Sequence, residues 1–196
     1  MRAFRRISPA FCISSTCICA LAVFSVAQAG QTEKLQQIKV KNFGCVNEKL
    51  YRGAQPKERD YADLAALGVK LIIDLQQDGE SDEQRLVEAQ GMKFFRIRMS
   101  DRSKPSFEQA DLFLKLVNDP SNQPVFVHCR GGRHRTGAMT AIYRLTHDGW
   151  NADQAFLEMK KYDFDYGFGH TPLKRFVYDY YSTIDSNSVV VNSHNR

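Results

Sequence analysis

The segment from Val125 to Gly137 combines a cysteine and an arginine in a pattern that can bind and attack a phosphate group. It reads Val-Phe-Val-His-Cys-Arg-Gly-Gly-Arg-His-Arg-Thr-Gly, and five residues separate Cys129 from Arg135. An apolar strand is predicted to end just before this cysteine, and a helix to begin near the arginine. Gly131 and Gly132 allow successive backbone N–H groups to turn toward one point. The helix N-terminus adds positive potential there, so the segment predicts a phosphate-sized anion site.

The residue types around this site suit nucleophilic attack on phosphorus. Cysteines in such positively polarised loops ionise readily, with pKa values of about 3.5–7.5 in known cases, so we expect Cys129 to be the nucleophile. The planar guanidinium of Arg135 can hold two phosphate oxygens. Thr136 can donate a hydrogen bond to the sulfur. His128 is expected to orient the cysteine, because a thiolate needs no general base.

The leaving oxygen needs a proton, and Asp101 is the best-placed donor. It follows the strand predicted over 94–99, and ligands of α/β sheets gather at the carboxyl ends of the strands. A carboxyl at this position can protonate the leaving oxygen and later accept a proton from water. Glu80, Asp82 and Glu83 follow another predicted strand and are the second choices.

Three further motifs accompany this segment, and together they resemble a known family. His128-Cys129-(x)5-Arg135-Thr136 resembles the signature of the cysteine-dependent protein tyrosine phosphatase superfamily. The three further motifs resemble the compact dual-specificity branch of this superfamily, which includes atypical bacterial, plant and fungal members. They are Leu50-Tyr-Arg-Gly-Ala-Gln-Pro56, Ile72-Ile-Asp-Leu75 and Met99-Ser-Asp101. The resemblance covers roughly 46–181. It implies a phosphatase without metal or cofactor, with Cys129 as nucleophile, Arg135 as phosphate-binding residue and Asp101 as general acid.

The loop between the cysteine and the arginine bears on the substrate. Its candidate substrate-binding residues are Arg130, Gly131, Gly132, Arg133 and His134. Related phosphoinositide phosphatases carry lysines at the positions of Arg130 and Arg133, and extra cations suit a multiply phosphorylated ligand. The same arginines could instead face solvent or pair with nearby carboxylates. The main expectation is a protein tyrosine or dual-specificity phosphatase acting on a phosphorylated protein. An inositol polyphosphate or phosphoinositide phosphatase is the alternative, and a non-catalytic phosphate-binding module is a weaker one.

The elements that must position these residues follow one another in alternation. Strands are predicted over 49–54, 69–75, 94–99 and 124–128, and helices over 58–67, 81–90, 106–117, 135–145, 152–161 and 173–181. Apolar runs such as Val-Lys-Leu-Ile-Ile-Asp-Leu are typical of strands buried on both faces. The pattern predicts an α/β fold whose central, mostly parallel sheet has four to five strands flanked by helices.

The ends of the chain differ from this central part. Arg2, Arg5 and Arg6, an apolar stretch and Ala27-Gln-Ala29 predict a cleavable signal peptide over 1–29, and hence a secreted or periplasmic protein without a membrane span. A loosely held lead-in is expected over 30–45, the phosphatase domain over 46–183, and a flexible tail over 184–196. Cleavage removes three arginines and no acidic residue, so the formal charge falls from +5 to +2. Little basicity then remains to suggest nucleic-acid binding, and we expect a monomer.

Two cysteines lie outside the predicted signal peptide, Cys45 and Cys129. Two widely spaced cysteines do not make a disulfide framework. Cys45 is expected to be a small buried or idle residue, although a regulatory disulfide with Cys129 is a sharper hypothesis. For Arg52, the sequence is compatible with either a structural or a phosphate-steering role.

Overall fold

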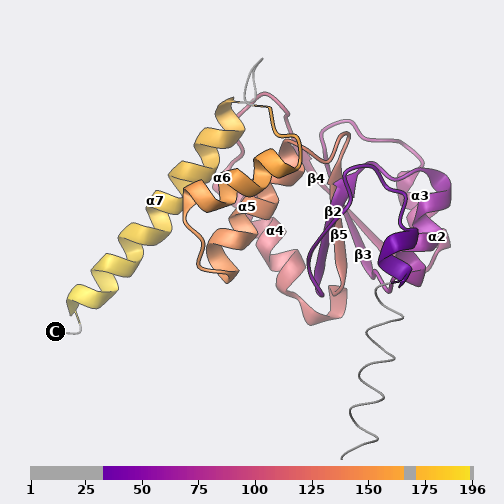
Figure 1. Cartoon of the computed structure of the whole chain (residues 1–196), viewed down its shortest axis with the longest axis horizontal. Helices are drawn as coiled ribbons and strands as arrows, with labels where there is room; N and C mark the ends of the chain where they lie inside the picture. The colour runs from indigo at the N-terminus through magenta and orange to yellow at the C-terminus, as the bar shows by residue number, and fades with distance from the viewer. Residues whose placement is uncertain (1–32, 166–170, 195–196) are drawn as a thin grey trace, which may run out of the picture. The chain divides into compact units, whose positions relative to one another are not determined.

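The computed structural model describes residues 33–165 and 171–194 (Figure 1). The chain divides into two units, Met1–Gln36 and Gln37–Arg196. All of the elements described below belong to the second unit. The predicted signal peptide over 1–29 lies outside the described residues.

A five-stranded sheet forms the centre of the second unit. Its strands lie in the order β1-β2-β5-β3-β4, and only the β1–β2 pair is antiparallel. The bounds are β1 Gly44–Asn47, β2 Leu50–Ala54, β3 Leu71–Gln76, β4 Lys93–Met99 and β5 Val125–Cys129. The structure therefore confirms the predicted α/β fold with a mostly parallel sheet. The carboxyl ends of the four parallel strands meet at one edge, where β5 ends at Cys129 and β4 at Met99.

Helices cover both faces of this sheet (Figure 1). Their bounds are α2 Glu58–Ala66, α3 Glu83–Ala89, α4 Phe107–Asn118, α5 Arg135–His147, α6 Ala152–Lys161 and α7 Thr171–His194, with a 3-10 turn over Pro120–Asn122. Side chains alternate between the faces of a strand, so Val125, Val127 and Cys129 join the apolar core that the sheet forms with α4 to α7. Phe126 and His128 point to the opposite face, which α2 and α3 cover.

The end of the predicted lead-in is part of this packed fold. Val40 is buried, and the ring of Phe43 stacks on those of Tyr51 and Phe126 at centroid distances of 5.9 and 6.3 Å. The backbone N–H of Ala54 donates to the carbonyl of Lys41 at 2.8 Å. The structure thus differs from the expectation for residues 40–45, because two apolar side chains in a mostly polar segment are enough to dock it. Strand β1 was not predicted, because it has only four residues and one of them is a glycine.

The C-terminal helix is longer than predicted. Helix α7 continues to His194, whereas a flexible tail was expected from 184 onward. The chain has no glycine or proline after Pro172, and these are the residues that most strongly end helices. Among the described residues, no helix combines the length and the hydrophobicity needed to cross a membrane.

Candidate active site

Cys129 and Arg135 lie at the two ends of one tight loop. Cys129 is the last residue of β5 and is 3% exposed, and Arg135 is the first residue of α5. The loop between them therefore runs from a buried strand directly into a helix N-terminus. This is the arrangement that the sequence predicted for an anion site.

Three carbonyl groups of the loop accept hydrogen bonds from donors on its outer side. The backbone N–H of Gln55 donates to the carbonyl of Arg130 at 3.4 Å, and the Asn42 side chain donates to those of Gly131 and Gly132 at 3.4 and 3.1 Å. The carbonyl and the N–H of one planar trans peptide point in opposite directions. The N–H groups that follow these carbonyls therefore turn toward the inside of the loop, where they can bind an anion.

The backbone of the loop requires a glycine at position 132, because of both its φ angle and the atoms that surround it. Its φ is +67°, in the left-handed region. A Cβ atom at this position would lie 2.4 to 2.6 Å from backbone atoms of Gly53 and Ala54. No residue with a side chain fits there without moving β2.

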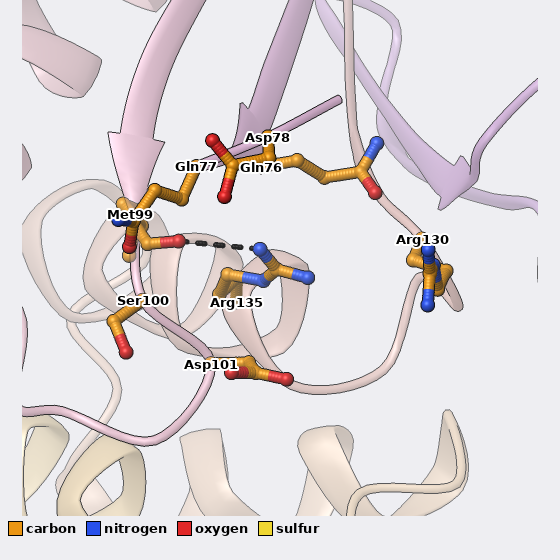
Figure 2. A pocket seen from close by; sticks show the side chains of 8 residues that line it. All are labelled: Gln76, Gln77, Asp78, Met99, Ser100, Asp101, Arg130 and Arg135. Carbon is orange, nitrogen blue, oxygen red and sulfur yellow. Dashed lines mark hydrogen bonds between the residues drawn. The ribbon is translucent and has the colours of Figure 1, made fainter. Parts of the chain in front are cut away.

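The Arg135 guanidinium is held at the edge of the sheet where β3 and β4 end. Its Nη1 donates to the carbonyl of Met99 at 3.2 Å and more weakly to that of Leu75 at 3.5 Å. Figure 2 shows the guanidinium between the end of β4 and the loop that begins at Arg130. Its Nε is buried and has no hydrogen-bond partner among the described residues. A planar fork in this position is suited to bind an oxyanion in the cavity.

Asp101 faces the same cavity as Cys129 and Arg135. One hollow, drawn in Figure 2, is lined by Gln76, Gln77, Asp78, Met99, Ser100, Asp101, Arg130 and Arg135. A second hollow is lined by Asp101, Cys129, Arg130, Gly131, Arg133, His134 and Arg135. Three residues belong to both, so the hollows adjoin at Asp101, Arg130 and Arg135. The structure thus brings the three predicted catalytic side chains together around one cavity.

The second-choice acids lie elsewhere, and a carboxylate that was not predicted from the sequence lies in the cavity. Glu80, Asp82 and Glu83 line a separate hollow beside α2 and α3. Asp78 instead lines the cavity that contains Arg135. Its position two residues past the end of β3 was the available signal, since the carboxyl ends of parallel strands share one edge.

His128 points away from the cavity, to the opposite face of the sheet. Its ring is fully buried, and its Nε2 lies 2.8 Å from Oε1 of Glu83 on α3. The ring is therefore placed to fix the end of β5 and not to take a proton from substrate. This position fits the predicted orienting role.

A buried ionic network surrounds His128. Glu83 also accepts hydrogen bonds from Tyr61 and Gln55 at 2.9 and 2.7 Å. Burial opposes the ionisation of Glu83, but the hydrogen bonds to His128, Gln55 and Tyr61 outweigh it and hold the pKa of this carboxyl below its usual range. Asp74 lies 3.9 Å from Nδ1 of the histidine.

The same network contains the one described group of side chains spaced as metal ligands. The ligand atoms of Asp74, Glu83 and His128 all lie within 4.8 Å of one another. Arg96 already supplies a cation to both carboxylates, with N–O distances of 2.6 Å to Asp74 and 3.5 Å to Glu83. The chemistry of this set is therefore that of a buried ion-pair network.

Arg130, Arg133 and His134 all line the cavity, whereas Thr136, in the first turn of α5, lies in the core. Neither Arg130 nor Arg133 makes an ion pair with any described residue. The ring of His134 packs edge-on against that of Phe164 at 5.3 Å. Thr136 is fully buried, and its hydroxyl has no hydrogen-bond partner in the described part of the chain.

Cys45 is too far away to bridge Cys129 in this fold. Both thiols are free, and Cys45 is exposed on β1 while Cys129 ends β5. Strand β2 lies between them. Two strand spacings amount to about 9–10 Å, whereas bridged cysteines have Cα atoms about 4.4–6.8 Å apart. A disulfide between them would require the sheet to rearrange, so the geometry disfavours this hypothesis.

Comparison with known proteins identifies similar sequences. A family model described as DSP-PTPase phosphatase fused to NAD+ kinase matches residues 21–171. Probable tyrosine-protein phosphatase DG1060 of Dictyostelium discoideum is 34% identical over 126 residues, which cover 62% of this chain and 75% of that protein. Inositol diphosphatase SIW14 of Saccharomyces cerevisiae is 26% identical over 129 residues, or 63% of this chain and 46% of that protein. Inositol diphosphatase DSP3 of Arabidopsis thaliana is 28% identical over 125 residues, or 61% of each. The chain spans less than two thirds of either inositol diphosphatase.

Solved structures share the fold. The core catalytic domain of the PP-IP phosphatase SIW14 from S. cerevisiae, in complex with citrate, superposes with a TM-score of 0.66 at 24% identity, covering 80% of this chain and 94% of that one. A cysteine-to-serine variant of TpbA from P. aeruginosa, in complex with phosphotyrosine, gives a TM-score of 0.60 at 23% identity, covering 69% of this chain and 82% of that one. The arrangement of sheet and helices is therefore that of these phosphatases.

Proposed function

This chain belongs to the cysteine-dependent dual-specificity phosphatases, in the family described as DSP-PTPase phosphatase fused to NAD+ kinase, and on that premise we propose that it hydrolyses phosphate monoesters through a phosphocysteine at Cys129. One observation carries the proposal. The loop that joins Cys129 to Arg135 has its carbonyls bonded outward, and it opens on a cavity that Asp101 also lines.

In the first step, the thiolate of Cys129 attacks phosphorus. The S–P bond forms while the bond from phosphorus to the leaving oxygen breaks, and the Asp101 carboxyl gives its proton to that oxygen. The negative charge of the transition state is spread over the equatorial phosphate oxygens, which the inward N–H groups of residues 130–135 and the Arg135 guanidinium bind.

In the second step, water attacks the phosphocysteine. The Asp101 carboxylate takes a proton from that water, the S–P bond breaks, and inorganic phosphate and the thiolate are released. The buried hydroxyl of Thr136 has no other partner among the described residues, so it is available to donate a hydrogen bond to the departing sulfur.

The primary test is loss of the nucleophile. Cys129→Ser is expected to abolish turnover of p-nitrophenyl phosphate, because a serine hydroxyl is a far weaker nucleophile than a cysteine sulfur. Cys45→Ser is the matched control, since this thiol is exposed on β1 and lies outside the cavity. Undiminished turnover by Cys129→Ser would reject the proposal.

A trapping experiment separates an enzyme from a module that only binds phosphate. Wild-type protein, mixed with p-nitrophenyl phosphate and quenched in acid within milliseconds, is expected to carry one phosphate on the peptide that contains Cys129. Tight binding with neither turnover nor a phosphocysteine would favour the module.

We propose a phosphotyrosine-containing protein as the substrate class. Cys129 lines the cavity and is only 3% exposed, which favours a phosphate carried on a group that reaches inward, as a phenyl ring does. The name of the D. discoideum relative is in keeping with this substrate.

An inositol polyphosphate is the second candidate, because Arg130 and Arg133 line the cavity with no ion pair to any described side chain. Comparing kcat/KM for phosphotyrosine peptides and for inositol polyphosphates distinguishes the two. If the inositol compound is the substrate, Arg130→Gln with Arg133→Gln is expected to lower kcat/KM for it more than tenfold, because two charges near a polyanion are lost. A larger loss with the peptide would exclude this candidate.

We also propose that the chain is exported as a monomer after cleavage behind Ala29. The basic, apolar and small-residue order of residues 1–29 supports export. Sequencing the N-terminus of the protein recovered from the periplasm or medium is expected to give Gly-Gln-Thr-Glu, and light scattering is expected to give the mass of one chain. Protein that keeps Met1 and stays in the cytoplasm would contradict export. A mass of two chains would contradict the monomer.

A further inference from the structure

A second arginine lies behind the loop and is not used by the mechanism above. Arg52, on β2, is fully buried. Its guanidinium carbon stands 3.8 Å from the centroid of the Tyr162 ring. No described carboxylate makes an ion pair with it. Burying an arginine in this way is costly unless its charge is used.

Arg52 contacts the loop directly. Its Nη2 donates to the carbonyl of Gly132 at 2.8 Å, inside the protein. This is the shortest of the bonds that hold loop carbonyls outward, and it fixes the peptide whose N–H belongs to Arg133. Asn42 donates to the same carbonyl at 3.1 Å, so loss of the Arg52 bond would loosen the hold on that N–H and leave the longer bond to keep the peptide in place.

The position of Arg52 also brings its charge near the nucleophile. In the β2–β5 register, Arg52 pairs with Val127 and Ala54 pairs with Cys129. Because side chains alternate along strands, Arg52 and Cys129 share one face of the sheet. Burial, helped by the repulsion of Arg144, lowers the pKa of Arg52 to about 10, against the attraction of Tyr162, Glu158 and Cys129. The guanidinium therefore remains charged at neutral pH.

The hydrogen bonds of Arg52 leave part of its donor capacity unused. Nε and Nη1 are buried and have no partner among the described residues. If Arg52 served only to fill space, an apolar side chain would do so at a lower cost in desolvation free energy. The unused donors and the unpaired charge favour an electrostatic role.

We propose that Arg52 is a positioning residue of the phosphate site: it holds the Gly132 carbonyl outward and keeps a buried positive charge behind the loop that stabilises the Cys129 thiolate and the bound phosphate. This inference rests on the proposed function, because it assigns Arg52 a role in that same site. Arg135 then binds phosphate from the cavity, while Arg52 acts through the loop from the opposite side.

The thiolate can be followed without turnover. The rate at which iodoacetamide alkylates Cys129, measured over pH by mass spectrometry of its peptide, gives the midpoint of ionisation. Arg52→Gln and Arg52→Met are expected to raise this midpoint by about one pH unit, the size typical of losing one nearby opposite charge. Both are also expected to weaken the binding of tungstate, a phosphate analogue, at least tenfold.

Arg52→Lys separates the charge from the carbonyl bond. Lysine keeps the charge but lacks the planar fork, so the midpoint is expected to stay within a few tenths of a unit while tungstate binding weakens severalfold. If Arg52→Gln and Arg52→Met do not fold, Arg52→Lys still decides, because a shift of a full unit in this variant would show that the charge is not the cause.

Arg144→Gln is the matched control. Arg144 is also a mostly buried arginine stacked on an aromatic ring, with its guanidinium 4.6 Å from the Trp150 centroid, and it pairs with Glu158 rather than with the loop. This variant is expected to lower the melting temperature without moving the alkylation midpoint. An unchanged midpoint in folded Arg52→Gln would overturn the inference. If the wild-type protein does not hydrolyse an aryl phosphate, the proposed function is overturned instead. The alkylation midpoint is measured without turnover, so it does not depend on that result.

Discussion

At the scale of single residues, Asp101 is the side chain whose role is most open to test. It shares the cavity with Cys129, whereas Asp82 lines a separate hollow. Asp101→Asn is expected to lower kcat by about 10²–10⁴-fold, the usual contribution of a general acid. The loss should be largest for esters with poorly leaving alkoxides, and the acidic limb of the pH–rate profile should change with it.

Two other variants make this result decisive. Asp82→Asn is the control and is expected to leave kcat unchanged. If Asp78→Asn reproduces the loss while Asp101→Asn does not, the acid is Asp78, which lines the other part of the cavity.

The two loop glycines are expected to respond differently to alanine. At Gly132 a Cβ atom would meet the backbone of β2 at 2.4 to 2.6 Å, and φ is +67°. At Gly131 the nearest atoms are 3.6 to 3.7 Å away and belong to the flexible Arg133 side chain. Gly132→Ala should therefore destabilise the protein by about 1–3 kcal/mol and abolish activity.

Gly131→Ala is the matched control and should change stability by less than about 0.5 kcal/mol. Urea unfolding and turnover of p-nitrophenyl phosphate check both variants. Equal effects of the two substitutions would contradict the geometry of the loop.

At the scale of elements, the Glu83–His128 contact ties helix α3 to the strand that carries the nucleophile. The pKa of Glu83 is held below its usual range. A carboxyl with a lowered folded-state pKa adds stability that is present above its unfolded pKa of about 4.3 and is lost as pH falls through the folded value. The contact should therefore help to hold β5 at neutral pH and fail in acid.

Glu83→Gln is the test of this contact. It is expected to cost about 1–3 kcal/mol at pH 7, with a smaller difference from wild type below about pH 4. Urea unfolding between pH 3.5 and 7 measures this. Glu88→Gln, an exposed residue of the same helix, should show no such pH dependence. A cost for Glu83→Gln that is constant with pH would mean that its charge contributes nothing.

At the scale of the whole molecule, phosphate binding should stabilise the fold, because the site joins β5, α5 and the ends of β3 and β4. A ligand at one hundred times its dissociation constant adds about 2.7 kcal/mol. For a chain of this size that corresponds to a rise of about 5–11 °C in melting temperature. Tungstate is the probe, and Arg135→Lys should remove most of the rise. A similar rise in that variant would place the anion elsewhere.

The main elements were predictable because their signals are local. Apolar runs predicted β3 and β5, and Gly68 and Gly91 were read as the stops of α2 and α3, where each now has a positive φ. Strand β1 was missed because four residues with a glycine carry little pattern, and it is recognised by pairing with β2. The docking of residues 40–45 depends likewise on contacts with distant rings.

The sequence alone was enough to propose the three catalytic residues. The five-residue spacing between Cys129 and Arg135 places both at the ends of one loop, and Asp101 follows a strand of the same sheet. The chain order also determined that an apolar strand would enter a glycine-containing loop and a helix. Those are properties of neighbouring residues, which local backbone preferences control.

The tertiary structure decided which distant groups surround that loop. It brought Asn42 and Arg52 onto the loop carbonyls, Asp78 into the cavity and Glu83 onto His128, and it set Cys45 two strands away from Cys129. These relations follow from strand order, register and the packing of helices on each face. They join residues far apart in the chain, so no local pattern contains them.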